Sequence, residues 1–116
     1  MNIEVWINKF KKYWESHDVN GVLGLFDKNV VYYETPFVKL NSFEELNREW
    51  GVIKDQENVK LEYEIFSSCE EKHSIIWKLS YENKDGILQD LSGTYLIKLN
   101  DKGLCDYFHH SCESEK

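Results

Sequence analysis

The spacing of hydrophobic residues changes once along this chain, and that change limits the folds open to it. In the N-terminal part, apolar side chains recur every three or four residues, as on one face of a helix. From Val59 onward they recur every second residue, as on a half-buried strand. The sequence therefore predicts an α+β protein in which helices come first and most of the sheet comes last.

Three helices are predicted before the change of spacing. The first covers residues 3–17 and places a row of apolar and aromatic side chains on one face. Asp18 is well placed to cap the N-terminus of a short second helix. Ser42 and Glu45 form a capping-box pattern that begins a third helix, which is expected to end within residues 51–55.

A strand is predicted over residues 26–37, because Val30, Val31, Tyr32 and Tyr33 favour extended structure. Pro36 is the only proline, and because it lacks an N–H group the strand should end or bend there. Four antiparallel strands follow within residues 59–65, 74–81, 87–99 and 104–112, and turns at 83–86 and 100–103 flank the third of them. Gly93 lies in the middle of the third strand, where we expect a bulge or bend.

This order predicts a curved antiparallel sheet wrapped around the N-terminal helices, in one domain over residues 1–116. Leu88, Leu96 and Ile76 lie on the face of the sheet that points away from the predicted core. No helix remains to cover that face. We therefore expect a homodimer in which two copies pack through their sheets.

Charge and composition limit the classes of partner that the protein is expected to bind. The chain has 14 lysine and arginine residues against 21 acidic residues, a net charge of −7, and Arg48 is its only arginine. Phosphate binding depends on clustered basic groups, so neither nucleic acid nor an anionic membrane is an expected partner. The N-terminal residues contain no long apolar run, which predicts a cytoplasmic protein without a signal peptide or membrane span. The three cysteines have no CxxC spacing, as is typical of reduced thiols.

Several of these features together resemble the nuclear-transport-factor-2-like superfamily. The resemblance is carried by the aromatic first helix, Asp18, the segment Phe26 to Phe37, the helix start at Ser42 to Leu46, and Asn100 to Gly103 before the last strand. It covers nearly the whole chain. It implies a cone-shaped α+β barrel like those of the ketosteroid isomerases and the polyketide-cyclase-like (SnoaL-like) proteins.

The resemblance also implies which positions would carry the chemistry of the isomerases. Their tyrosine on the first helix corresponds to Phe10 here, the base before the proline to Thr35, and the second acid on the long strand to Tyr95. Phenylalanine has no proton to donate and threonine is not a base near neutral pH, so the isomerase set is not retained. Tyr95 can still donate a hydrogen bond.

Glu34 is the candidate for a replacement base, because burial in an aromatic pocket would raise its pKa. Either His109 or His110 could act opposite it, since imidazole titrates near neutrality. Adjacent residues on a strand point to opposite faces, so these histidines do not predict a metal site. We interpret Glu34, Tyr95 and His110 as the candidate catalytic residues. The expected ligand pocket adds Trp14, Tyr33, Thr35, Trp50, Tyr63, Trp77 and Gln89.

The sequence thus favours a pocket for an apolar or aromatic small molecule, with no cofactor. Two alternatives stay open. One is a cofactor-independent acid–base enzyme of the isomerase, cyclase or dehydratase type. The other is a non-catalytic dimeric interaction module whose interior is filled by side chains.

Overall fold

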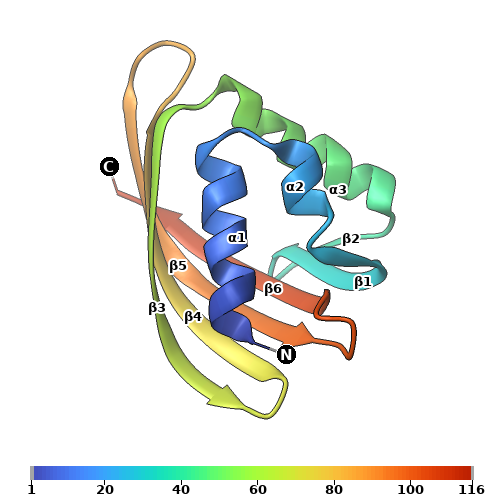
Figure 1. Ribbon diagram of the computed structural model, residues 1–116. Helices are drawn as coiled ribbons and strands as arrows, with labels where there is room; N and C mark the ends of the chain where they lie inside the picture. Colours follow the sequence, from blue (N-terminus) through green and yellow to red (C-terminus); the bar gives the residue numbers. More distant parts are fainter. Residues whose placement is uncertain (1, 116) are drawn as a thin grey trace.

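The computed structural model describes residues 2–115, in which the helices lie against the concave side of a curved six-stranded sheet (Figure 1). This confirms the predicted α+β architecture. The elements in chain order are α1 (Ile3–Glu15), α2 (Val19–Leu23), β1 (Phe26–Thr35), β2 (Val38–Leu40), α3 (Phe43–Trp50), the 3-10 helix η1 (Gly51–Asp55), β3 (Glu57–Cys69), β4 (Lys72–Glu82), β5 (Leu88–Leu99) and β6 (Cys105–Ser114).

The two predicted helix starts are confirmed by their hydrogen bonds. The Asp18 carboxylate accepts a hydrogen bond from the backbone N–H of Gly21 at 2.9 Å, which satisfies a donor in the first turn of α2. The Ser42 hydroxyl accepts one from the N–H of Glu45 at 3.2 Å. The Glu45 side chain in turn accepts from the N–H of Asn41 at 2.6 Å. In the usual capping box this partner would be the N–H of the N-cap residue itself, which is Ser42 here.

The strands are ordered β2-β1-β6-β5-β4-β3 across the sheet. All neighbours are antiparallel except β1 and β6, which run parallel. The predicted strand before Pro36 ends at Thr35, and the chain turns back into the short edge strand β2. Because β1 joins the sheet beside β6, the segment before the proline lies next to the end of the last strand.

The expected bulge at Gly93 is wrong. Gly93 pairs with Trp77 on one side and Cys112 on the other, and neither pairing shifts at that point. A Cβ atom at Gly93 would lie 1.9 Å from the carbonyl oxygen of Ser111. The glycine is therefore required for the close approach of β5 to β6, which no larger residue would allow without a backbone shift.

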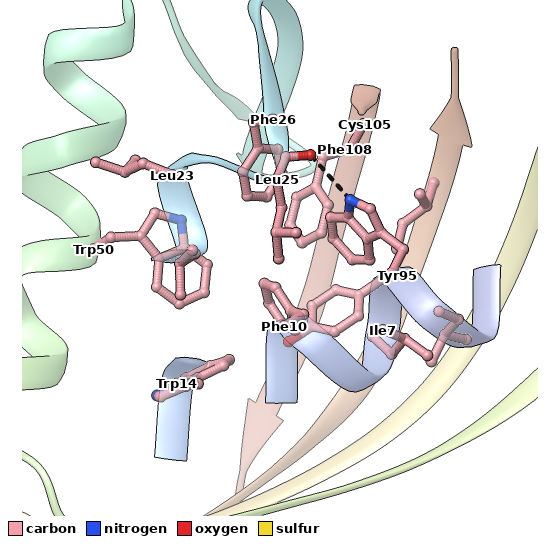
Figure 2. Packing of buried hydrophobic residues seen from close by; sticks show 14 of the residues in the cluster. Ile7, Phe10, Trp14, Leu23, Leu25, Phe26, Trp50, Tyr95, Cys105 and Phe108 are labelled. Atoms are coloured by element: carbon pink, nitrogen blue, oxygen red, sulfur yellow. Dashed lines mark hydrogen bonds between the residues drawn. The ribbon is translucent and has the colours of Figure 1, made fainter. Parts of the chain in front are cut away.

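The core between α1 and the sheet is rich in aromatic rings (Figure 2). Phe10 is completely buried, and its ring lies 5.2 Å from that of Trp6 and 6.2 Å from that of Phe108. The indole N–H of Trp6 donates to the carbonyl of Leu25 at 2.9 Å, the dashed line in Figure 2. Side chains thus fill the inner part of the cone. Trp77, which is also in the core, differs from Trp6, because its buried indole N–H has no hydrogen-bond partner in the described part of the chain.

Among the described residues, no helix lies on the convex face of the sheet (Figure 1). As predicted, Leu88, Leu96 and Ile76 are exposed there. None of the helices in the described part of the chain is long and apolar enough to cross a membrane.

Candidate functional site

A cavity of about 80 Å³ lies at one end of the concave face, where α1, α3 and η1 meet three strands of the sheet. The cavity is far smaller than the interior of the cone because aromatic and aliphatic core side chains fill the rest of that space. Its walls include Trp14 from α1, Tyr32 and Glu34 from β1, Trp50 from α3, Tyr95 from β5 and His110 from β6.

Glu34 reaches this cavity because it lies two residues after the buried Tyr32, on the same face of β1. Burial, reinforced by repulsion from the Glu49 carboxylate, raises the pKa of Glu34 to about 7. At neutral pH the carboxyl group is therefore present in both protonation states. A group with such a pKa can both accept and return a proton.

Two phenols lie close to this carboxyl group. The hydroxyl of Tyr32 accepts a hydrogen bond from the indole N–H of Trp50 at 3.0 Å, which leaves its own proton free to donate. In the described part of the chain, the hydroxyl of Tyr95 has no hydrogen-bond partner. Burial, with a smaller contribution from Glu34, raises the pKa of both phenols well above the usual value. Both therefore remain protonated donors at neutral pH.

His110 is held in one orientation by β1. Its Nδ1 lies 2.8 Å from the backbone carbonyl oxygen of Glu34, and because a carbonyl only accepts, Nδ1 carries the proton. Burial lowers the pKa of His110 more than this hydrogen bond raises it. The 3.9 Å approach of Nδ1 to the Glu34 carboxylate is therefore a contact of a neutral imidazole rather than an ion pair. The unprotonated Nε2 is left as a possible proton acceptor.

The Trp77 ring supports this arrangement from behind. It stacks on Tyr95 at 5.1 Å and on His110 at 5.4 Å, although β4 and β6 are separated by β5. The residue of β5 opposite Trp77 is Gly93, which has no side chain to stand between the rings. Gly93 therefore helps to orient a candidate catalytic histidine.

The structure gathers five of the predicted site residues around the cavity: Trp14, Glu34, Trp50, Tyr95 and His110. The other five do not line it. Tyr33 lies on the opposite face of the sheet, where its ring is 5.2 Å from that of His109 and tilted by 40°. The hydroxyl of Tyr63 bonds to Asn8 at the surface, and Trp77 stacks on Tyr95. The Gln89 amide donates to the Ile87 carbonyl, and the hydroxyl of exposed Thr35 accepts from the N–H of Phe37.

Sequence reasoning missed six residues of the cavity, three apolar ones (Val52, Ile53 and Phe108) and three with polar groups (Tyr32, Glu49 and Gln56). Tyr32 could have been found, because it shares a strand face with Glu34. No periodic pattern in the sequence predicts that the side chains of Glu49 and Gln56 face the interior of the cone. Gln56 is buried, and its side-chain oxygen accepts from the indole N–H of Trp14 at 2.8 Å, which leaves its amide N–H groups available.

The cavity offers donors and acceptors to an organic molecule rather than ligands to a metal. Within residues 2–115, no group of three or more histidine, cysteine, aspartate or glutamate side chains is arranged to hold a metal ion. His109 and His110 point to opposite faces of β6, as the alternation of the strand requires.

Neither a protein-family model nor a curated protein matches the sequence. Solved structures match over nearly the whole chain. A protein described as NTF2-like and of unknown function, from Exiguobacterium sp. 255-15, is 14% identical with a TM-score of 0.77, over 93% of this chain and 98% of that one. The chain has the cone-shaped fold of these NTF2-like proteins, which is the fold that the sequence resemblance implied.

Two further structures show the range of functions on this fold. A Δ5-3-ketosteroid isomerase from Mycobacterium sp. is 15% identical with a TM-score of 0.79, covering 97% of this chain and 98% of that chain. Rv0760c from Mycobacterium tuberculosis, in complex with estradiol-17β-hemisuccinate, is 18% identical with a TM-score of 0.78, covering 92% and 90%. At these identities the likeness establishes the fold alone.

Proposed function

We propose that the cavity binds a small organic molecule and that the protein catalyses a proton transfer on it without a cofactor, with Glu34 as the general base. The observation that carries this proposal is a carboxyl group with a pKa of about 7 that faces two phenol donors across an aromatic cavity. A general base works best when its pKa is near the working pH.

The reaction class that suits these groups is removal of a proton from a carbon next to a carbonyl. The Glu34 carboxylate takes the proton, the C–H electron pair moves into the new C=C bond, and the carbonyl oxygen gains negative charge. The hydroxyls of Tyr95 and Tyr32 donate hydrogen bonds to that oxygen. Protonated Glu34 then returns the proton to the same or a neighbouring carbon, so no other reactant is consumed.

These residues take over roles that the resemblance assigned elsewhere. Phe10, at the position of the isomerase tyrosine, is buried in the core and has no polar atom to offer. Thr35, at the position of the base, is exposed and its hydroxyl belongs to the hairpin turn. In this proposal Glu34, the residue before Thr35 on β1, is the base, and Tyr32 on the same strand is a hydrogen-bond donor.

The size of the cavity limits the ligand. At about 80 Å³ it holds the equivalent of roughly two or three waters of ~30 Å³ each, whereas pockets for drug-sized ligands span about 300–1,000 Å³. Only a compact group therefore enters. A ligand as large as the estradiol derivative bound by Rv0760c would have to displace core side chains such as Trp14 and Trp50.

The proposal is tested by hydrogen exchange into a small ketone. Cyclopentanone is incubated with the protein in D₂O near pH 7, and loss of the proton signals next to the carbonyl is followed by ¹H NMR. We expect exchange above the buffer rate with the wild-type protein and exchange at the buffer rate with Glu34→Gln. Glu44→Gln, which makes the same charge change at an exposed position on α3, is the matched control and should exchange like wild type. Wild-type exchange no faster than buffer would contradict the proposal.

The small cavity also supports the interaction-module alternative, in which no ligand enters. The exchange assay separates the two, because a filled cone gives no acceleration in any variant.

We further propose that the protein is a homodimer through the convex sheet face. Exposed Leu96 and Ile76 support this, because apolar side chains on a face without helices gain free energy when a second copy covers them. Light scattering at micromolar concentration should give twice the monomer mass, with Leu96→Lys reducing it toward the monomer. A monomeric mass for the wild type would overturn this proposal.

A further inference from the structure

We propose that the cavity recognises a cation, namely a compact organic ammonium group. This inference rests on the proposed function in that it names the ligand class of the same site. It follows from the charges, the aromatic walls and one unpartnered hydroxyl group of the cavity.

The charged groups in the cavity wall are acidic. Glu34 and Glu49 contribute carboxylates, and no lysine or arginine is among the described residues that line it. His110 does not offset them, because its Nδ1 proton is donated to a backbone carbonyl and its ring is neutral. A cation between the two carboxylates would relieve their mutual repulsion, whereas an anionic ligand would add to it. The net charge of −7 favours the approach of a cation as well.

The aromatic walls suit the same ligand. The rings of Trp14 and Trp50 meet edge to face, with centroids 4.9 Å apart and planes at 85°, and Tyr32 and Tyr95 complete the walls. Aromatic faces attract an ammonium group through their negative quadrupole, and indole does so most strongly. The hydrogen bonds from Trp14 to Gln56 and from Trp50 to Tyr32 fix both indoles before any ligand arrives.

The cavity wall also contains a hydroxyl group that makes no hydrogen bond within the described part of the protein. Tyr95 is only 2% exposed and lines the cavity, and within residues 2–115 its hydroxyl makes no hydrogen bond to another protein group. The hydroxyl is not among the fully buried atoms that lack a partner, so it keeps access to the cavity, where a ligand can bond to it. The phenol oxygen can accept an N–H group or contact the polarised methyl groups of a quaternary ammonium ion.

The opening of the cavity suits a ligand whose ammonium group lies inside and whose remaining atoms lie outside. Val52, which is 58% exposed, and Glu49, which is also exposed, belong both to the lining and to the surface. The ammonium group can therefore enter the small cavity while the rest of the molecule remains at the mouth. Together with the proposed chemistry, this describes a compact compound that carries an ammonium group close to its acidic C–H bond.

The test compares choline with 3,3-dimethylbutan-1-ol, which has the same shape but no charge. Binding is followed by ¹H–¹⁵N NMR of the four indole N–H signals, because only Trp14 and Trp50 line the cavity. We expect choline to shift these two signals and to bind at least tenfold more tightly than the alcohol. Equal affinity for the two compounds, or shifts confined to Trp6 and Trp77, would overturn the inference.

Two variants test whether the carboxylate of Glu49 contributes to the binding of the cation. Glu49→Gln should weaken choline binding about fivefold to tenfold without changing the affinity for the alcohol, whereas Glu44→Gln on the same helix should change neither. Near-UV circular dichroism checks that both variants are folded. No loss in Glu49→Gln would overturn the assignment.

The outcomes separate the two proposals. Choline binding with no ketone exchange would retain the cation site and remove the catalytic function. Ketone exchange without a preference for choline would do the reverse.

Discussion

The inner part of the cone and its open end are built from the same strands, yet one is packed solid and the other carries polar chemistry. On β6, Phe108 is buried in the core, and His110 two residues later lines the cavity. A short displacement along one strand face therefore separates a residue that stabilises the fold from one that can act on a ligand.

The largest expected effect comes from the inner part. Phe10 is completely buried and contacts the rings of Trp6, Trp14 and Tyr95. Phe10→Ala should lower the free energy of unfolding by about 3–5 kcal/mol, because it removes buried surface and leaves a void. Urea denaturation measures this, with Phe10→Leu as a control expected to lose less than half as much. A loss below about 1 kcal/mol would mean that the interior is loosely packed.

The next effect is at the open end and depends on pH. The pKa of Glu34 is about 7 in the folded protein against the ordinary 4.5 of a glutamate side chain, so the folded state binds the proton more tightly. The contribution of Glu34 to the free energy of unfolding is therefore most favourable below about pH 4.5, and it falls as the pH rises toward 7. The full shift corresponds to about 3 kcal/mol, which solvent screening of this partly exposed group reduces to about 1–2 kcal/mol.

Glu34→Gln removes that penalty. At pH 8 the variant should be more stable than wild type by about 1–2 kcal/mol, and the difference should vanish near pH 4. Urea denaturation at both pH values gives the two free energies. A variant that is less stable than wild type at pH 8 would show that the carboxylate stabilises the fold, and would remove the contrast between the two regions.

The smallest expected change in stability is at the unpartnered phenol. Tyr95→Phe removes a hydroxyl that bonds to nothing in the described part of the chain, so the free energy of unfolding should change by less than about 0.5 kcal/mol. The same substitution should slow ketone exchange about 100-fold, because an oxyanion donor is lost.

Tyr32→Phe provides the contrast for this prediction. It leaves the indole N–H of Trp50 without an acceptor and should cost about 1–2 kcal/mol of stability. If Tyr95→Phe instead proved as destabilising as Tyr32→Phe, its hydroxyl would have to be bonded within the protein.

Local sequence signals predicted the elements well. Asp18 and the box at Ser42 and Glu45 set helix starts through hydrogen bonds between near neighbours, so they can be recognised without a structure. Pro36 ended its strand for an equally local reason, the missing N–H group. The expected bulge at Gly93 was wrong because a central glycine serves equally for a bulge and for a close approach of two strands. Only the unshifted pairing with Cys112 and the nearby Ser111 carbonyl distinguish the two.

The candidate site was predictable only in part. Strand alternation assigned Tyr95 to the inner face and left His109 and His110 as alternatives. Whether Glu34 points inward depends on the pairing of β1 with its neighbours, and Thr35 rather than Glu34 occupies the position that the resemblance favoured. Glu49 and Gln56 lie on α3 and just after η1, and no period in the sequence indicates that they meet the sheet.

By itself, the sequence determined the α+β class, the order of the elements and the aromatic character of the interior, because each depends on spacing and on contacts between near neighbours. The tertiary structure decided that the cone is nearly full and that Glu34, Tyr32, Tyr95 and His110 share the space that remains. The physical reason is that volume and pKa depend on side chains brought together from distant segments. The raised pKa of Glu34 arises from burial by several elements and from Glu49, fifteen residues away along the chain.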